Sequence, residues 1–114
     1  MTTFDEREKA FEAKYRLDQE TAFKVNIRRD KLLGLWAAEQ MGLAGDAAKG
    51  YALTVVDAEF SESDHDPSHK VARDFAAMGI AIDEATIRAQ KDRMFELARE
   101  QVLGEIERRG PLSR

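Results

Sequence analysis

The sequence predicts an all-α fold in which four helices pack as a bundle. The chain has 114 residues, only two of them proline, and 35% are charged, well above the usual quarter. Alanine and glutamate are abundant, and both favour helix. Apolar residues recur at helical spacing, and no strand pattern or internal repeat is visible. The length suits one compact domain that buries roughly two-thirds of its unfolded surface.

The first predicted helix runs unbroken from about Thr3 to Met41, because no glycine or proline precedes Gly34. Thr3 and Glu6 have the spacing of a capping box. One apolar seam keeps its phase throughout, at Phe4, Phe11, Tyr15, Ala22, Val25, Leu32 and Trp36. After residue 20 the seam is widened by Phe23, Ile27, Leu33 and Leu35. Residues 21–41 therefore read as a core helix, and 3–19 as an extension of it.

The extension makes this helix too long for the rest of the bundle. At ~1.5 Å per residue, the first helix would measure about 58 Å and the last helix only about 39 Å. The first helix is therefore expected to overhang the bundle or to bend. Its first part has little to bury and is expected to fray when the protein is free.

Glycine, proline and aspartate mark the other helices. Gly42 and Gly45 end the first helix, and Asp46 is expected to cap the second, over residues 46–62. Asp66-Pro67 begins the third helix, over 67–78, and Gly79 ends it. Asp83 caps the last, over 84–109, which Gly110-Pro111 ends. The side chains expected to be buried on these helices are Ala48, Tyr51, Ala52, Val55, Val56, Phe60, Val71, Phe75, Met78, Ile87, Met94, Leu97, Ala98, Val102 and Ile106.

Composition excludes several classes of protein. The net charge is −4 and the isoelectric point about 5.2, which argues against general nucleic-acid binding. The absence of cysteine excludes disulfides and thiolate chemistry. No signal peptide and no apolar run of membrane-spanning length is present, so a cytoplasmic location is expected.

Four short stretches could carry chemistry, and the plainer interpretation is favoured for each. The glycines of 42–50, with Lys49, lack the spacing of a phosphate loop and suit a turn. His65 and His69, with Asp64 and Asp66, suit a solvated loop better than a metal site. The acidic run 57–66 is interpreted as a solvated patch, and the basic run 24–31 as the wet face of a helix. No nucleophile is paired with a base, so an enzyme is not expected.

Two interpretations are open for the N-terminal segment. Phe4, Phe11 and Tyr15 could pack on the last helix, or they could insert into another protein. A helix of about sixteen residues is marginal in water by itself. Such a segment can become ordered in a partner's groove and present its apolar side chains as anchors.

The stretch "MTTFDEREKAFEAKYRLDQETAFKVNIRRDKLLGLWAAEQMGL" resembles the N-terminal half of the zeta subunit of alphaproteobacterial F-type ATP synthases. The resemblance continues through "GDAAKGYALTVVDAEF", "DHDPSHKVARDF" and the final helix. It implies an α-helical bundle that inhibits ATP hydrolysis by F1. In the family the N-terminal segment wedges between α and β catalytic subunits, close to γ, and blocks rotation in the hydrolysis direction while sparing synthesis.

Carried onto this chain, the resemblance implies an inhibitory arm over residues 1–19 and a helical bundle over 20–114. The expected anchors are Phe4, Phe11 and Tyr15, and the expected polar contacts are Asp5, Glu6, Arg7, Glu8, Lys9, Glu12, Lys14 and Arg16. The expected partners are the α, β and γ subunits of F1, at the periphery of the inner membrane. No metal is expected. The resemblance also implies adenine-nucleotide binding, which no motif supports or locates. The alternative function is a helical interaction module or a nucleotide-binding sensor without F1 inhibition.

Overall fold

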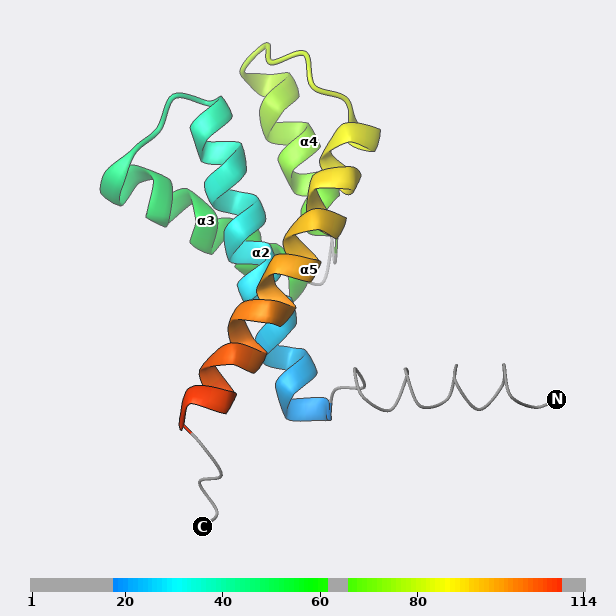
Figure 1. Ribbon diagram of the computed structural model, residues 1–114. Helices are drawn as coiled ribbons and strands as arrows, with labels where there is room; N and C mark the ends of the chain where they lie inside the picture. Colours follow the sequence, from blue (N-terminus) through cyan, green and yellow to red (C-terminus); the bar gives the residue numbers. More distant parts are fainter. Residues whose placement is uncertain (1–17, 62–65, 110–114) are drawn as a thin grey trace, which may run out of the picture.

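The computed structural model describes residues 18–61 and 66–109, and within them it contains only helices and their connections. The helices are α2 (Gln19–Gln40), α3 (Gly45–Glu59), α4 (Pro67–Ala77) and α5 (Glu84–Arg109) (Figure 1). The prediction of an all-α fold with four packed helices is confirmed.

Helix α2 begins at Gln19 because Asp18 caps it. Asp18 has an extended backbone, with φ −71° and ψ 171°, and its Oδ1 accepts a hydrogen bond from the backbone N–H of Thr21 at 2.7 Å. An aspartate in this position satisfies a donor that the first turn would otherwise leave unpaired. The prediction of one unbroken helix from Thr3 is therefore wrong at Asp18. The predicted capping box of Thr3 and Glu6 lies outside the described residues.

Two of the three other predicted caps are confirmed. Asp66 accepts from the N–H of Ser68 at 3.0 Å and precedes Pro67, which opens α4. Asp83 accepts from the N–H of Thr86 at 2.9 Å, at the start of α5. The predicted cap at Asp46 is wrong.

Helix α3 instead begins one residue earlier, at Gly45, after an extended Ala44 that makes no side-chain capping hydrogen bond. Asp46 therefore lies in the first turn, where its charge suits the positive end of the helix dipole. The helix also ends earlier than predicted. Phe60 is its C-cap, so the prediction that the helix extends to residue 62 is wrong at this point.

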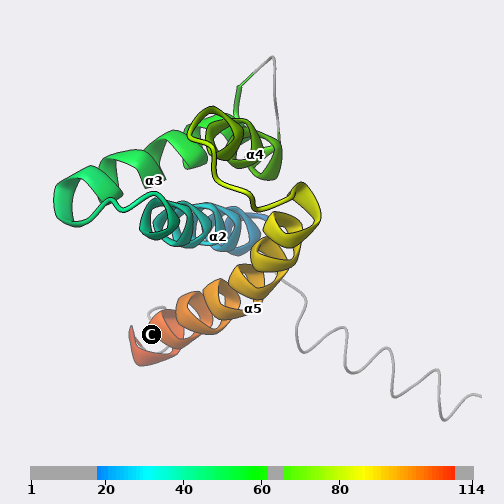
Figure 2. The ribbon, with the colours of Figure 1, turned by 90° about the horizontal axis from the view of Figure 1, so that it is seen from above.

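Helix α2 lies between α3 and α5 and contacts both (Figure 2). Helix α4 packs against α3 and α5 near the C-terminal end of α2. At the opposite end of the molecule, α2 begins beside the C-terminal half of α5 (Figure 1).

The core has two parts along α2. The larger one joins all four helices through Leu33, Ala37, Val55, Val71, Phe75 and Ile87, with Trp36 packed 5.8 Å from the Phe75 ring. The smaller one joins α2 to α5 through Val25, Ala98 and Val102. Trp36 therefore belongs to the core, as predicted.

Five residues expected to lie on the buried side of their helices are exposed instead. They are Phe23, Phe60, Met78, Leu97 and Ile106. Phe60 and Met78 are the C-caps of α3 and α4, so both lie at a helix end where the packed face stops. Leu97 and Ile106 lie on the C-terminal half of α5, where Ala98 and Val102 turn toward α2 and no second neighbouring helix is described.

Gly34 permits the close approach of α2 and α3. A Cβ atom at this position would lie 2.6 Å from the Ala52 Cα and 3.0 Å from the Ala52 Cβ. Since one of these neighbours is backbone, the two helices would have to separate to accept any side chain. The glycine thus sets the distance between the two helices that share the main core.

We predict that Gly34→Ala destabilises the protein by about 1–3 kcal/mol, because the added methyl group overpacks this contact. Urea denaturation measures the change. Gly50→Ala is the matched control, since Gly50 also lies within a helix but has no atom within 4 Å of an added Cβ. The control should be stabilised by roughly 0.5–1 kcal/mol. Equal effects of the two substitutions would show that the α2–α3 contact is not limiting.

Candidate partner-binding site

The residues predicted to bind a partner precede the described chain. Phe4, Asp5, Glu6, Arg7, Glu8, Lys9, Phe11, Glu12, Lys14, Tyr15 and Arg16 all lie outside the described residues. The described surface closest to them in the sequence is the end of the bundle where α2 begins. This end carries a groove and an exposed aromatic pair, which we call the arm-proximal face.

The groove lies between the N-terminal half of α2 and the C-terminal half of α5 and has a volume of about 500 Å³. Its apolar lining comes from Phe23, Ile27 and Val102. Its charged lining comes from Glu20, Lys24, Arg28, Lys31 and Glu105. An apolar centre with a charged rim is the usual anatomy of a protein interface.

The aromatic pair adjoins this groove. The rings of Phe23 on α2 and Phe60 after α3 lie 5.8 Å apart at an interplanar angle of 51°. They are 52% and 53% exposed. Phe23 belongs to both the pair and the groove, so the apolar surface continues from the end of α3 across α2 to α5.

Charged side chains at the rim of the groove form ion pairs within the bundle. Arg28 joins α2 to α5, with Nη1 2.8 Å from Gln101 Oε1 and 2.9 Å from Glu105 Oε2. Lys24 lies 3.7 Å from Glu20 on the same helix. The basic run 24–31 is therefore more than a wet helical face, since Arg28 and Arg29 bind acidic groups of other helices.

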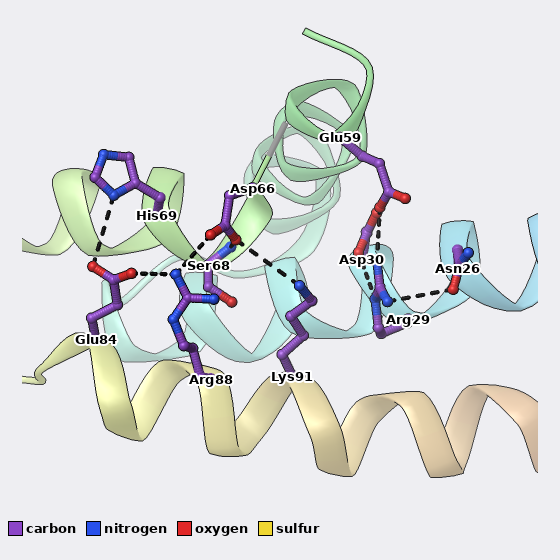
Figure 3. Close-up of polar contacts among 10 residues, drawn as sticks. All are labelled: Asn26, Arg29, Asp30, Glu59, Asp66, Ser68, His69, Glu84, Arg88 and Lys91. Carbon is purple, nitrogen blue, oxygen red and sulfur yellow. Dashed lines mark hydrogen bonds and ion pairs between the residues drawn. The ribbon is translucent and has the colours of Figure 1, made fainter. Parts of the chain in front are cut away.

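Arg29 ties the end of α3 to α2 (Figure 3). Its Nε donates to Asp30 Oδ1 at 2.9 Å, and its Nη2 donates to Glu59 Oε1 at 2.8 Å. Glu59 directly precedes Phe60, so this contact also fixes where Phe60 leaves the helix. The acid Glu59, predicted to be part of a solvated patch, is used to connect two helices.

Asp30 is a fully buried carboxyl group between these helices. Its Oδ2 accepts no hydrogen bond from any residue that the structure describes. Burial raises the pKa of Asp30 to about 8, and the neighbouring Glu59 carboxylate also favours the proton. The raised pKa fits the unpartnered oxygen, because the neutral acid needs fewer hydrogen-bond donors than the carboxylate. Asp30 therefore keeps its proton to higher pH than an exposed aspartate does.

A second polar cluster joins α4 to α5 (Figure 3). Arg88 Nη2 lies 2.7 Å from Asp66 Oδ2 and also contacts Glu84, and Lys91 lies 3.9 Å from Asp66. Glu84 in turn lies 3.7 Å from His69 Nδ1.

The weaker hypothesis of a metal site at His65, His69, Asp64 and Asp66 gains no support from this arrangement. Asp66 and His69 bind partners on α5, while Asp64 and His65 lie outside the described residues. Within 18–61 and 66–109, no three His, Asp or Glu side chains gather as metal ligands. Lys49, of the glycine-rich stretch 42–50, is exposed on α3.

Sequence reasoning missed Asp30 and the aromatic pair. Asp30 lies three residues after Ile27 and three before Leu33, so the helical period already places it on the buried side. That spacing was a usable signal. The pairing of Phe23 with Phe60 had none, because it depends on how the end of α3 meets α2.

Within the described residues, the chain is a helical bundle whose arm-proximal face has the apolar and charged composition of a protein-binding surface. The family model of the ATPase inhibitor subunit zeta matches residues 1–101, and the chain belongs to this family. Membership makes it a regulator of an ATPase rather than an enzyme, and implies inhibition and binding of F1-ATPase. A comparison with curated proteins found no match. None of the described helices has the length and hydropathy required to span a bilayer.

We predict that stability falls as the pH rises from 3.8 to about 8, because folded Asp30 keeps a proton that the unfolded chain releases. The contribution is complete below pH 3.8 and is lost by the time Asp30 ionises in the folded state. The slope should not exceed about 1.4 kcal/mol per pH unit. Asp30→Asn keeps the shape and should flatten this part of the curve. Denaturant unfolding at several pH values tests both.

The two exposed caps titrate in a different range. Backbone N–H donation from Thr21 lowers the pKa of Asp18, and hydrogen bonds with Thr86 lower that of Asp83. Their stabilising contribution is present above pH 3.8 and is lost only as the pH falls below it. An unchanged slope between pH 5 and 8 in Asp30→Asn would therefore contradict a protonated Asp30.

Proposed function

We propose that the chain inhibits ATP hydrolysis by inserting residues 1–19 at an interface between α and β catalytic subunits of F1, close to γ. The inserted segment blocks γ in the hydrolysis direction and leaves synthesis unaffected. The observation that carries this proposal is the family match, which covers residues 1–101 and thus includes the whole segment.

The composition of the segment supports insertion into a groove. The spacing of Phe4, Phe11 and Tyr15 would place all three on one face if the segment is helical when bound, and we infer that they act as the anchors. The polar contacts are Asp5, Glu6, Arg7, Glu8, Lys9, Glu12, Lys14 and Arg16, four acidic and four basic residues. Balanced charges of this kind contribute orientation and specificity more than affinity.

The start of α2 supports separate roles for the N-terminal segment and the bundle. Asp18 satisfies a donor in the first turn of α2 without help from a preceding helical turn. The buried core described above lies between Val25 and Val102. We infer that the bundle holds its fold without residues 1–17 and acts as the stop that keeps the segment from passing through F1.

The bundle adds little support to the alternative functions. A helical interaction module without F1 inhibition would use the same apolar face, but the family match favours F1 as the partner. Adenine-nucleotide binding, implied by the earlier resemblance, stays a prediction to which no described residue is assigned.

We predict that a chain lacking residues 2–17 remains folded and loses inhibition of F1 hydrolysis. Asp18 is kept so that α2 retains its cap. Hydrolysis by F1 from a matching alphaproteobacterium reports inhibition, and circular dichroism with thermal unfolding reports the fold. Equal potency of the truncated and complete chains would contradict the proposal.

We further predict that Phe11→Ala weakens inhibition roughly tenfold or more, as expected for a buried aromatic anchor. Lys9→Ala, the neighbouring control, should change potency only a few-fold, since exposed charge pairs contribute little. Inhibition constants at fixed salt provide the comparison. A larger effect at Lys9 than at Phe11 would show that charge rather than apolar burial drives binding.

A further inference from the structure

We propose that the arm-proximal face is a second contact with F1, in which Phe23 and Phe60 pack against an apolar, acidic-edged surface beside the entrance of the N-terminal segment. This inference rests on the proposed function, because insertion of the segment is what brings the face to F1. It adds the described bundle to an interface otherwise assigned to residues 1–19.

The first argument is position. Seventeen residues of the sequence precede Asp18, the first residue that the structure describes. Phe23 follows Asp18 by five residues, a distance of roughly 7.5 Å along a helix at ~1.5 Å per residue. A partner that holds the chain up to this point therefore meets Phe23 within about one and a half turns. The tether gives this second contact a high effective concentration, so it can form even if it is weak alone.

The second argument is that the rings of Phe23 and Phe60 are exposed and that a contact within the bundle fixes their position. Both rings are about half exposed although they belong to the largest apolar side chains of the chain. Arg29 holds Glu59, the residue before Phe60, with a hydrogen bond of 2.8 Å. The pair is therefore held in place before a partner arrives. A preorganised aromatic surface loses little conformational entropy on binding and is typical of an interface hot spot.

The third argument is charge. The groove rim holds three cations and two carboxylates, Lys24, Arg28, Lys31, Glu20 and Glu105. Arg28 binds Glu105 and Lys24 approaches Glu20, so these charges are already balanced within the bundle. The remaining positive charge is that of Lys31, whose side chain is exposed. The fitting partner surface is therefore apolar at its centre, with a carboxylate opposite Lys31.

The test is inhibition of F1 by the complete chain carrying Phe23→Ala and Phe60→Ala together. Met78→Ala is the matched control, since Met78 is 54% exposed and lies at the C-terminal end of α4, away from the start of α2 (Figure 1). The double variant should inhibit about tenfold more weakly than the unsubstituted chain, and the control should be unchanged. Thermal unfolding of each variant verifies the fold.

Lys31→Glu is a second test, which leaves both aromatic side chains unchanged. It should weaken inhibition several-fold at low salt, and the loss should shrink as ionic strength rises. Because Lys31 is exposed, this substitution leaves the core intact.

Two other occupants of the arm-proximal face would each give a different result in this test. If residues 1–17 of the same chain cover the face, the double variant inhibits more strongly than the unsubstituted chain. If a second copy covers it, the unsubstituted chain sediments as a dimer, the double variant as a monomer, and inhibition is equal. Either result, or unchanged potency of all variants, overturns the inference while leaving the proposed function intact. Absence of inhibition by the unsubstituted chain overturns both.

Discussion

The hydrogen bond from the Thr21 N–H to Asp18 Oδ1 fixes where the bundle begins. A seam of apolar residues in one helical phase passes through this point, so periodicity alone would continue the helix. The extended backbone of Asp18 interrupts it, and the side chain supplies the acceptor that a first turn needs. Helix α2 can therefore start without the residues before it. The proposed inhibitory segment and the scaffold that presents it are joined at a defined residue.

The contacts of Arg29 with Asp30 and Glu59 are a second constraint on the structure. It connects the end of α3 to α2 and so sets the position of the exposed Phe60 beside Phe23. A buried carboxyl group costs stability relative to apolar packing. Burial raises the pKa of Asp30, which lessens the cost of a buried charge, and the Arg29 guanidinium bridges Asp30 and Glu59. The end of the bundle where α2 begins thus combines these polar contacts with the smaller apolar core of Val25, Ala98 and Val102, while the main apolar core joins all four helices farther along.

Much of the fold could be predicted from the sequence because its signals are local. The caps Asp66 and Asp83 and the buried residues Val25, Phe75 and Ile87 follow from turn chemistry and helical spacing. The errors arose where a local signal competed with a stronger one. At Asp18 the cap prevailed over an unbroken seam, and at Asp46 the helix began a residue before the expected cap. Phe60 and Met78 were exposed because their helices end there, which spacing cannot reveal.

The candidate site, too, could be predicted from the sequence only in part. Its eleven predicted residues precede the described chain, so they stay predictions from the resemblance and the seam. The arm-proximal face joins residues of three helices that are far apart in the sequence, from Phe23 to Phe60 and Val102. Only tertiary packing brings them together, and no motif records it. Asp30 is intermediate, since its helical phase indicated burial but not its partners.

The most direct test of the central claim is site-specific photo-crosslinking on F1 under hydrolysis conditions. A photoreactive phenylalanine analogue at position 11 should crosslink to the α or β subunits, and the products should map to their shared catalytic interface. The same analogue at position 78, at the far end of the bundle, should not crosslink to that interface. Crosslinks from position 11 that fall outside the α/β interface, or only within the chain itself, would contradict insertion of the N-terminal segment.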